Sequence, residues 1–360
     1  METGNNNNKV NSNNIGNIGY KVKKEPAILL AHGDGGIKTG ELVEKIIRKY
    51  IKNDILDKFE DSAVLPPSNK RIAFTTDSYV IEPIFFPGGD IGKLSICGTV
   101  NDLATCGAVP RYLSFSLILE EGLPIHDLEK IMKSINETIK EVATGMVIVT
   151  GDTKVVNSGN ADRIYINTAG IGIVDEAVEL SYSRIEPGDM IIFTGTAGDH
   201  GIAILSRRKE FDFKTSLKSD CAPLNKLVDE CLKCSGNIHA IRDATRGGLA
   251  RIMIELAQSS RSDFLIYHND IPVKKETRAI CEFLGMDPLY IANEGKLAIF
   301  VAAQDAEKVL ETINNNRYGN DARIIGKVLK KGSGTVILET EIGTRRHLDL
   351  HYSEQLPRIC

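Results

Sequence analysis

The stretch GTVNDLATCGAVPRYLS, residues 98–114, carries an acidic residue in the middle of an apolar helical pattern. Apolar or small residues recur around it at the spacing of a helix: Leu94, Cys97, Val100, Leu103 and Ala104. Aspartate is common at helix N-caps and in turns, but a position inside the helix offers Asp102 no cap to make. We therefore predict that Asp102 binds a ligand.

Four other segments place an acidic residue beside small or hydroxylated residues at the end of a strand or helix. They are Thr76-Asp77-Ser78, Gly151-Asp152-Thr153, Gly198-Asp199-His200 and Arg242-Asp243-Ala244-Thr245. Carboxylates on such loops hold hard cations and phosphates. One such segment could be an ordinary turn. With Asn101-Asp102 there are five such segments, and together they predict a polyphosphate site.

The sequence lacks the two common nucleotide-binding motifs. After Gly35 and Gly40 it continues with Glu41-Leu42, where a P-loop has a lysine and a hydroxyl residue. No Gly-x-Gly-x-x-Gly lies between a strand and a helix with an acid further on, so hydride transfer has no support.

Strand-like and helix-like patterns alternate in both halves of the chain, which predicts an α/β (α+β) fold. The predicted strands include Arg71 to Thr76, Met146 to Thr150, Met190 to Phe193, Lys296 to Val301 and Thr335 to Leu338. Helical patterns surround Leu128 to Val142, Leu224 to Cys231, Leu249 to Leu256 and Ala306 to Ile313.

A turn-rich segment near the midpoint predicts a boundary between two domains, 27–183 and 184–343. The Asn-rich residues 1–26 have little apolar material and predict a disordered extension. Residues 344–360 are largely polar and predict a mobile tail, and the 15 residues after Arg345 could reach about 50 Å when extended.

Composition excludes several classes of protein. The 360 residues are 42% apolar, enough for real cores, and the net charge of −4 with no long basic run gives no electrostatic footprint for nucleic acid. No apolar run approaches the roughly 20 residues of a membrane helix, and the start is no secretory signal. We expect a cytoplasmic protein with seven free cysteines.

Cys360 differs from the other cysteines because a thiol at the last residue of a polar tail has no core to join. It suits a swinging carrier of a covalent substrate, although an accidental terminal cysteine remains an alternative. Cys231 and Cys234 continue the apolar face of a helix near its C-terminus, so we predict packing residues there rather than redox or zinc ligands. His32 and His200 lie in glycine-rich segments, where phosphate contact and solvent exposure are both open.

A set of long segments in constant order resembles the HypE carbamoyl dehydratase family, within the superfamily of aminoimidazole ribonucleotide synthetase and selenophosphate synthetase. The segments are AHGDGG (31–36), TTDSYVIEPIFFPGGDIGKL (75–94), GTVNDLATCGAVPRYLS (98–114), GDTKVV (151–156), GDHGIAIL (198–205), SDCAPL (219–224), RDATRGGLA (242–250), ANEGKL (292–297) and PRIC (357–360).

The resemblance implies two α/β domains like those of aminoimidazole ribonucleotide synthetase, a homodimer, and ATP with Mg²⁺ bound between the domains. It implies that the HypF carbamoyltransferase carbamoylates Cys360. ATP then drives dehydration of the thiocarboxamide to a thiocyanate, and the cyano group passes to iron on a HypC–HypD complex. The product supplies cyanide ligands for the iron of a [NiFe]-hydrogenase.

By the same resemblance, Asp77, Asp102 and Asp243 hold Mg²⁺ and phosphates, with Asp152 close by. His32 and Gly33 lie in the glycine-rich segment expected at the nucleotide. Glu294 matches the base that takes an amide proton, and Lys154 its charge partner; a turn and a solvated cation are the alternatives for these two.

Three rival functions can be compared with this one, and the sequence disfavours the first two. A selenophosphate synthetase carries a reactive Cys or selenocysteine in its N-terminal glycine-rich segment, and residues 31–40 contain no Cys. A purine-pathway synthetase has no use for a terminal PRIC. A thiol-bearing scaffold without turnover would show no ATP hydrolysis when carbamoylated.

Overall fold

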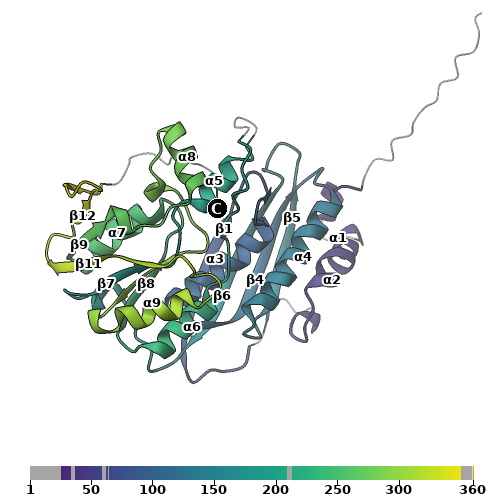
Figure 1. Cartoon of the computed structure of the whole chain (residues 1–360). Coiled ribbons are helices and arrows are strands. Elements are labelled where there is room, and N and C mark those ends of the chain that lie inside the picture. The colour runs from purple at the N-terminus through teal and green to yellow at the C-terminus, as the bar shows by residue number, and fades with distance from the viewer. Residues whose placement is uncertain are drawn as a thin grey trace, which may run out of the picture.

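Two β-sheets, one from each half of the chain, organise the computed structural model (Figure 1). It describes residues 26–33, 37–58, 62–63, 65–208, 213–349 and 359. The strands are β1 (Arg71–Tyr79), β2 (Phe85–Phe86), β3 (Gly89–Asp90), β4 (Ala108–Glu120), β5 (Val147–Val156), β6 (Ile164–Val174), β7 (Met190–Phe193), β8 (Ile238–Asp243), β9 (Ser262–Tyr267), β10 (Leu297–Val301), β11 (Arg323–Lys331), β12 (Val336–Glu339) and β13 (Arg345–His347).

Helices pack around both sheets, as the alternating patterns predict. The helices are α1 (Ile37–Leu42), α2 (Arg48–Tyr50), α3 (Ile91–Thr105), α4 (Ile125–Val142), α5 (Asp199–Leu205), α6 (Asn225–Cys234), α7 (Gly248–Ser260), α8 (Lys275–Leu284) and α9 (Ala306–Asn314). A π-helical segment, Val43–Ile47, joins α1 to α2. The α/β fold class is thereby confirmed.

The first sheet has the order β1-β6-β4-β5, with β4 and β5 parallel and the other pairs antiparallel. Helix α3 lies on one face of this sheet and packs against α4. The apolar stripe of α4, including Leu128, Ile131 and Ile135, enters the same core as Leu113 and Leu117 of β4. This core forms because α4 repeats its apolar residues every three or four positions and β4 every two.

The second sheet has the order β13-β12-β9-β11-β7-β10-β8 and separates two cores. In β7, Ile191 and Phe193 face the core that contains α7, whereas Ile192 faces the core that contains α6 and α9. Alternate residues of one strand point to opposite faces, so a fully apolar strand is expected when helices cover both faces of a sheet.

The chain remains ordered past residue 344, where the tail is predicted to start. Strand β13 pairs antiparallel with β12, and the buried Leu348 donates its N–H to the carbonyl of Val336 at 2.9 Å. An apolar residue with a strand to pair with thus extends the domain to residue 349. The predicted domain boundary at 184 falls in the connection from β6 to β7 and stays a prediction, and the predicted extension 1–26 lies outside the described residues apart from Pro26.

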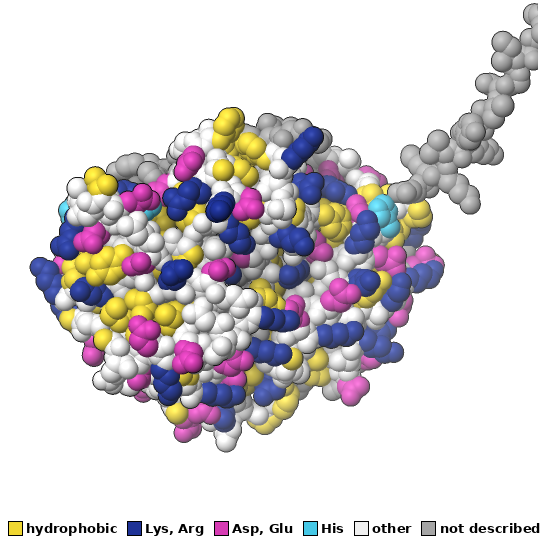
Figure 2. Space-filling model, in the orientation of Figure 1, with side chains coloured by type: hydrophobic (Ala, Val, Ile, Leu, Met, Phe, Trp, Pro, Cys, Tyr) yellow, Lys and Arg dark blue, Asp and Glu magenta, His cyan; other side chains and the backbone are white. Residues whose placement is uncertain are grey.

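Charges of both signs are interspersed over the face of the molecule that Figure 2 presents. This agrees with the small net charge of the sequence. Within the described part of the chain, no helix is both long and apolar enough to cross a membrane.

Candidate active site

Helix α3 links the two halves of the molecule and presents Asp102. Asp90 caps its start by accepting the N–H groups of Gly92 and Lys93 at 2.8 and 3.0 Å. One turn before its end, Asn101 donates to the carbonyl of Ala222 at 3.0 Å and accepts the N–H of Leu224 at 2.8 Å. The helix is therefore tied to the second domain beside Asp102.

Asp77 and Asp102 form a close pair of carboxyl groups. The hydroxyl of Thr75 donates to Asp102 Oδ2 at 2.8 Å, and that of Tyr79 donates to Asp77 Oδ2 at 3.1 Å. Burial and then the charge of Asp102 raise the pKa of Asp77 to about 6. Burial also raises the pKa of Asp102, against the opposing effect of the Thr75 hydrogen bond.

Asp243 joins this pair from the second sheet, at the end of β8. Its pKa is raised to about 7, first by burial and then by the charge of Asp102, while Arg242 opposes the rise. A carboxyl group is harder to ionise when it is buried and when another carboxylate lies beside it, so a cation at this place would be favourable. The structure thus brings together the three aspartates predicted to bind metal and phosphate.

Glu294 lies on a tightly held loop before β10, with 3% of its surface exposed. Its backbone N–H donates to Asp220 Oδ1 at 3.0 Å, and the preceding Asn293 accepts the N–H of Gly198 at 2.8 Å. The next residue must be glycine, because a Cβ on Gly295 would lie 1.8 Å from the carbonyl oxygen of Asp220.

The Glu294 carboxyl has an unused oxygen. Among the described residues, no group hydrogen-bonds to the buried Glu294 Oε1 or to the buried Asp220 Oδ2. Burial, followed by the charges of Cys221 and Asp243, raises the pKa of Glu294 well above its ordinary value. Since buried polar atoms are almost always partnered, these two oxygens indicate a missing donor at this place.

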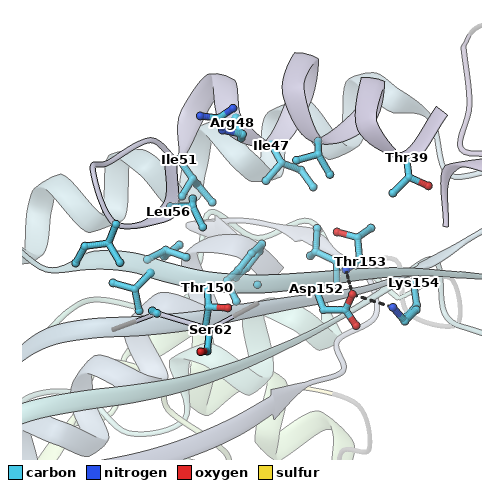
Figure 3. Close-up of a pocket in the computed structure, with 18 of the residues that line it drawn as sticks. Thr39, Ile47, Arg48, Ile51, Leu56, Ser62, Thr150, Asp152, Thr153 and Lys154 are labelled. Carbon is cyan, nitrogen blue, oxygen red and sulfur yellow. Dashed lines mark hydrogen bonds and ion pairs between the residues drawn. The ribbon is translucent and has the colours of Figure 1, made fainter. Parts of the chain in front are cut away.

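Asp152 and Lys154 lie elsewhere, on β5, at one end of a pocket of about 350 Å³ (Figure 3). They form an ion pair of 2.8 Å, which lowers the pKa of Asp152, and both are more than half exposed. Ile47, Ile51 and Leu56 line the other part of the pocket, under the N-terminal helices. The pocket therefore combines an apolar wall with a charged end.

The glycine-rich segment borders this pocket through Gly33. A Cβ on Gly33 would lie 2.5 Å from the backbone nitrogen of Val155, so the segment approaches β5 closely. His32 accepts the N–H of Leu29 on Nδ1 at 2.9 Å, and burial lowers its pKa. Residues 34–36 lie outside the described residues.

Two residues of the GDHG segment do not join the predicted polyphosphate site. Both oxygens of the buried Asp199 bind protein groups: Oδ1 accepts from Thr277 at 2.7 Å, and Oδ2 pairs with Lys274 at 2.6 Å. His200 is fully buried in α5 instead of lying in a loop. The prediction that five acidic segments form one site is wrong because tertiary contacts use Asp199 inside the core.

The cysteine predictions meet different outcomes. Cys231 is buried and Cys234 half-buried at the end of α6, which confirms their packing role, and burial raises the pKa of Cys231 to about 12. The predicted carrier, Cys360, lies outside the described residues.

Sequence reasoning missed Asp220 and Tyr79. Asp220 lies in a segment without a strand or helix, so its role depends on the approach of Gly295. The only available signal was its place in SDCAPL, one of the segments of the family resemblance.

The fit to a divalent cation depends on the donor set. Within the described ranges, no three or more His, Cys, Asp or Glu side chains form a preassembled metal-binding group. Yet buried carboxylate oxygens are the hard donors that Mg²⁺ prefers, and Mg²⁺ usually completes its shell with water and phosphate. The three aspartates therefore fit such an ion, and their role as ligands stays a prediction.

Comparison with known proteins gives the fold a family. The N-terminal domain of AIR synthase related proteins matches residues 59–174, and the C-terminal domain of these proteins matches residues 186–339. A carbamoyl dehydratase HypE of Rhizobium leguminosarum bv. viciae is 45% identical over 345 residues, covering 95% of this chain and 98% of the relative.

Solved structures agree. A hydrogenase maturation protein HypE in complex with ATP has a TM-score of 0.87 and 42% identity, covering 92% of this chain and 99% of that one. A chain of a HypE–HypF complex has a TM-score of 0.75 and 44% identity, covering 86% and 99%. With identities above 40% over nearly the whole length, this chain belongs to the HypE carbamoyl dehydratase family.

Proposed function

We propose that this protein uses ATP to dehydrate a carbamoyl group carried on the Cys360 thiol, forming S-cyano-cysteine in a lyase-type reaction. The cyano group supplies the cyanide ligands of [NiFe]-hydrogenase iron. The observation that carries the proposal is the buried, unpartnered Oε1 of Glu294 beside the aspartate cluster. A primary amide is the donor that this oxygen lacks, and the name carbamoyl dehydratase borne by the Rhizobium relative supports the reaction.

ATP is the second substrate, and the pocket between β5 and the N-terminal helices is the proposed place for its nucleoside. Its apolar wall suits a flat base, and its end with Asp152, Lys154 and the Gly33 backbone suits the polar part of the nucleotide. The size of about 350 Å³ is in the usual range for a ligand pocket. The HypE structure solved with ATP supports ATP as the nucleotide.

Asp77, Asp102 and Asp243 are the residues that would hold Mg²⁺. A magnesium ion there would neutralise charge on the phosphoryl group transferred to the carbamoyl oxygen, so that phosphate can leave where hydroxide cannot. The fit of the ion follows from three buried carboxyl groups whose pKa values are raised first by burial and, for Asp77 and Asp243, also by the charge of Asp102.

Glu294 acts as the base for the amide proton. Conversion of R–S–C(=O)–NH₂ to R–S–C≡N removes both N–H protons and the oxygen, which leaves as phosphate. The Glu294 oxygen is buried, so a carboxylate there is a stronger base than one in water. Asp220 fixes the backbone of the base. Lys154, which pairs with Asp152 on β5, is proposed as the charge partner of the thiocarboxamide from the family resemblance alone.

Three partners follow from this function. The HypE–HypF complex supports HypF as the carbamoyl donor for Cys360, and the HypC–HypD complex is proposed as the acceptor of the cyano group. A homodimer is proposed on the open face of the first sheet, where Ile72, Phe74 and Val109 are exposed.

The test is the mass of the C-terminal peptide after incubation with HypF, carbamoyl phosphate and Mg·ATP. We expect a carbamoyl mass first and a cyano mass at later times of the incubation, both lost in Cys360→Ala. Cys106→Ala is the matched control, because Cys106 is an exposed thiol outside the proposed chemistry. Cyano product from Cys360→Ala would refute Cys360 as the carrier thiol. A carbamoyl mass that never converts to the cyano mass would favour a thiol scaffold without turnover.

A further inference from the structure

The residue before the terminal cysteine is buried between the two domains. Ile359 is 3% exposed, forms an antiparallel bridge with Ile81 just after β1, and belongs to the first core. A residue so close to a chain end is normally exposed unless it is tied down. The contacts that hold Ile359 therefore form a specific seat.

His200, at the start of α5, supplies a side-chain hydrogen bond to that seat. Its Nε2 lies 2.6 Å from the carbonyl oxygen of Ile359, and its Nδ1 lies 2.7 Å from Ser219 Oγ. The edge of the Phe86 ring packs against the imidazole with centroids 5.6 Å apart. The ring is completely buried and both its nitrogens are used.

The groups at the two ends of this row of hydrogen bonds, the Ile359 carbonyl and the Cys221 N–H, fix the direction of every bond between them. A carbonyl oxygen only accepts, so Nε2 of His200 carries the hydrogen and donates it to Ile359. In the neutral ring Nδ1 then accepts from the Ser219 hydroxyl, whose oxygen accepts the Cys221 N–H at 3.1 Å. Burial lowers the pKa of His200 to about 4, which keeps the ring neutral.

One short segment links the seat to the proposed base. Ser219 orients the imidazole that holds Ile359, and the next residue, Asp220, accepts the backbone N–H of Glu294. The positions of the penultimate residue and of the base are therefore set by neighbouring residues of the same backbone.

We propose that His200 is a positioning residue that holds the Ile359 carbonyl and so places the carbamoylated Cys360 for dehydration. This inference rests on the proposed function, since it needs Cys360 to carry the reacting group. Release of the same hydrogen bond frees the chain end for its visit to the carbamoyltransferase. Among the described residues, Ile359 is held by the His200 hydrogen bond, the bridge to Ile81 and one buried apolar side chain, a contact small enough to break in every cycle.

The experiment compares His200→Phe, which keeps a ring but has no donor, with His200→Gln, which retains a donor near the place of Nε2. His239→Phe is the matched control, because His239 is also largely buried and hydrogen-bonded, to Asp189 at 2.8 Å, away from Ile359. The first readout needs no catalysis: the rate at which iodoacetamide alkylates Cys360, followed by the mass of the C-terminal peptide.

We expect iodoacetamide to alkylate Cys360 about tenfold faster in His200→Phe than in wild type, because the variant loses one well-placed hydrogen bond. In single turnover its carbamoyl-to-cyano conversion falls about tenfold, while carbamoylation by HypF and the KM for ATP stay unchanged. His200→Gln recovers most of both losses, and His239→Phe matches wild type.

The inference would be overturned if His200→Phe showed the wild-type rates of Cys360 alkylation and of carbamoyl-to-cyano conversion. It would also be overturned if His200→Phe and His200→Gln had equal rates. If His200→Phe does not fold, Ser219→Ala tests the same chain of bonds: faster alkylation supports it and a wild-type rate overturns it. Cyano product from Cys360→Ala would instead refute the proposed function, so the two failures are distinguishable.

Discussion

At the scale of single residues, Glu294 separates a dehydratase from a thiol scaffold. Glu294→Gln keeps the size of the side chain and the backbone hydrogen bond to Asp220, but its amide cannot accept a proton. We expect it to be carbamoylated and to bind ATP, yet to form the cyano product about 10²–10⁴-fold more slowly. The mass of the Cys360 peptide in single turnover measures this, and conversion at the wild-type rate would transfer the role of base to Lys154 or a bound water.

His200 makes stability depend on pH. Its pKa is about 4 in the folded protein and 6.5 when unfolded, so only the unfolded chain binds the proton between these values. The stabilisation is complete above pH 6.5 and is lost as the pH falls towards 4, roughly 3 kcal/mol in all.

Urea unfolding of wild type and His200→Gln at pH 7 and pH 5 tests this expectation. The other titrating groups are common to both proteins and cancel in the difference. The advantage of wild type should shrink by about 2 kcal/mol at pH 5. An advantage of the same size at both pH values would show that the histidine is charged, or not linked to folding.

The sequence predicted the site in part, and the reason is visible residue by residue. Asp102 was recognisable because it interrupts a helical pattern, and its approach to Asp243 then follows from the contact of α3 with β8. Asp199 has the same signal as Asp77 and Asp243, an acid beside small residues, but it binds Lys274, a residue 75 positions away. Local sequence cannot distinguish a carboxylate used by the core from one left for a ligand.

At the scale of elements, α3 and β1 approach each other at a glycine. A Cβ on Gly98 would lie 2.3 Å from the Tyr79 hydroxyl, which binds Asp77. Alanine normally stabilises a helix relative to glycine, but overpacking here should cost about 1–3 kcal/mol. We expect Gly98→Ala to lower the melting temperature and to weaken Mg·ATP use by displacing Tyr79.

Gly40→Ala is the control, since nothing lies within 4 Å of the added Cβ in α1. It should stabilise the protein by roughly 0.5 kcal/mol. Adding Tyr79→Phe to Gly98→Ala removes the closest atom and should recover part of the loss. A Gly98→Ala protein as stable as wild type would mean that α3 shifts freely on β1.

Strand β4 shows why some elements could not be predicted. Pro110 lies within its thirteen residues, and proline normally argues against a strand interior. Here the register with β6 shifts between Pro110 and Tyr112, so a bulge accommodates the ring. The long strands and amphipathic helices with regular patterns, such as β6 and α4, were predictable because local pattern and tertiary burial agree.

At the scale of the whole molecule, the two domains share a core. Residues of the second domain, including Ile202, Leu217 and Cys221, pack into the same cluster as Ile81 and Leu94 of the first. The proposed nucleotide pocket lies under the N-terminal helices of the first domain, whereas the aspartate cluster and the Ile359 seat take residues from both domains. Mutations at the contact between the domains should therefore affect catalysis more than nucleotide binding.

The open face of the first sheet gives the last prediction. Directly paired residues of neighbouring strands point to the same side, so Ile72 lies in one row with Ile173 and Val109, and Phe74 lies in the next row with Ile171. Ile72 is 60% and Phe74 68% exposed, although apolar side chains gathered in rows on a monomer usually mark an interface.

A second copy of the chain would cover these rows. In a twofold dimer both subunits contribute the same surface, so any substitution there is present twice in the contact. Phe74→Asp should therefore weaken the dimer about 100-fold or more, because it places a charge in each half of an apolar contact. Phe283→Asp is the control, since Phe283 is 77% exposed on α8, in the other domain. Sedimentation velocity across a dilution series should show Phe74→Asp as a monomer where wild type and Phe283→Asp remain dimers. Unchanged sedimentation of Phe74→Asp would exclude this face as the dimer contact and leave its exposed side chains for a different partner.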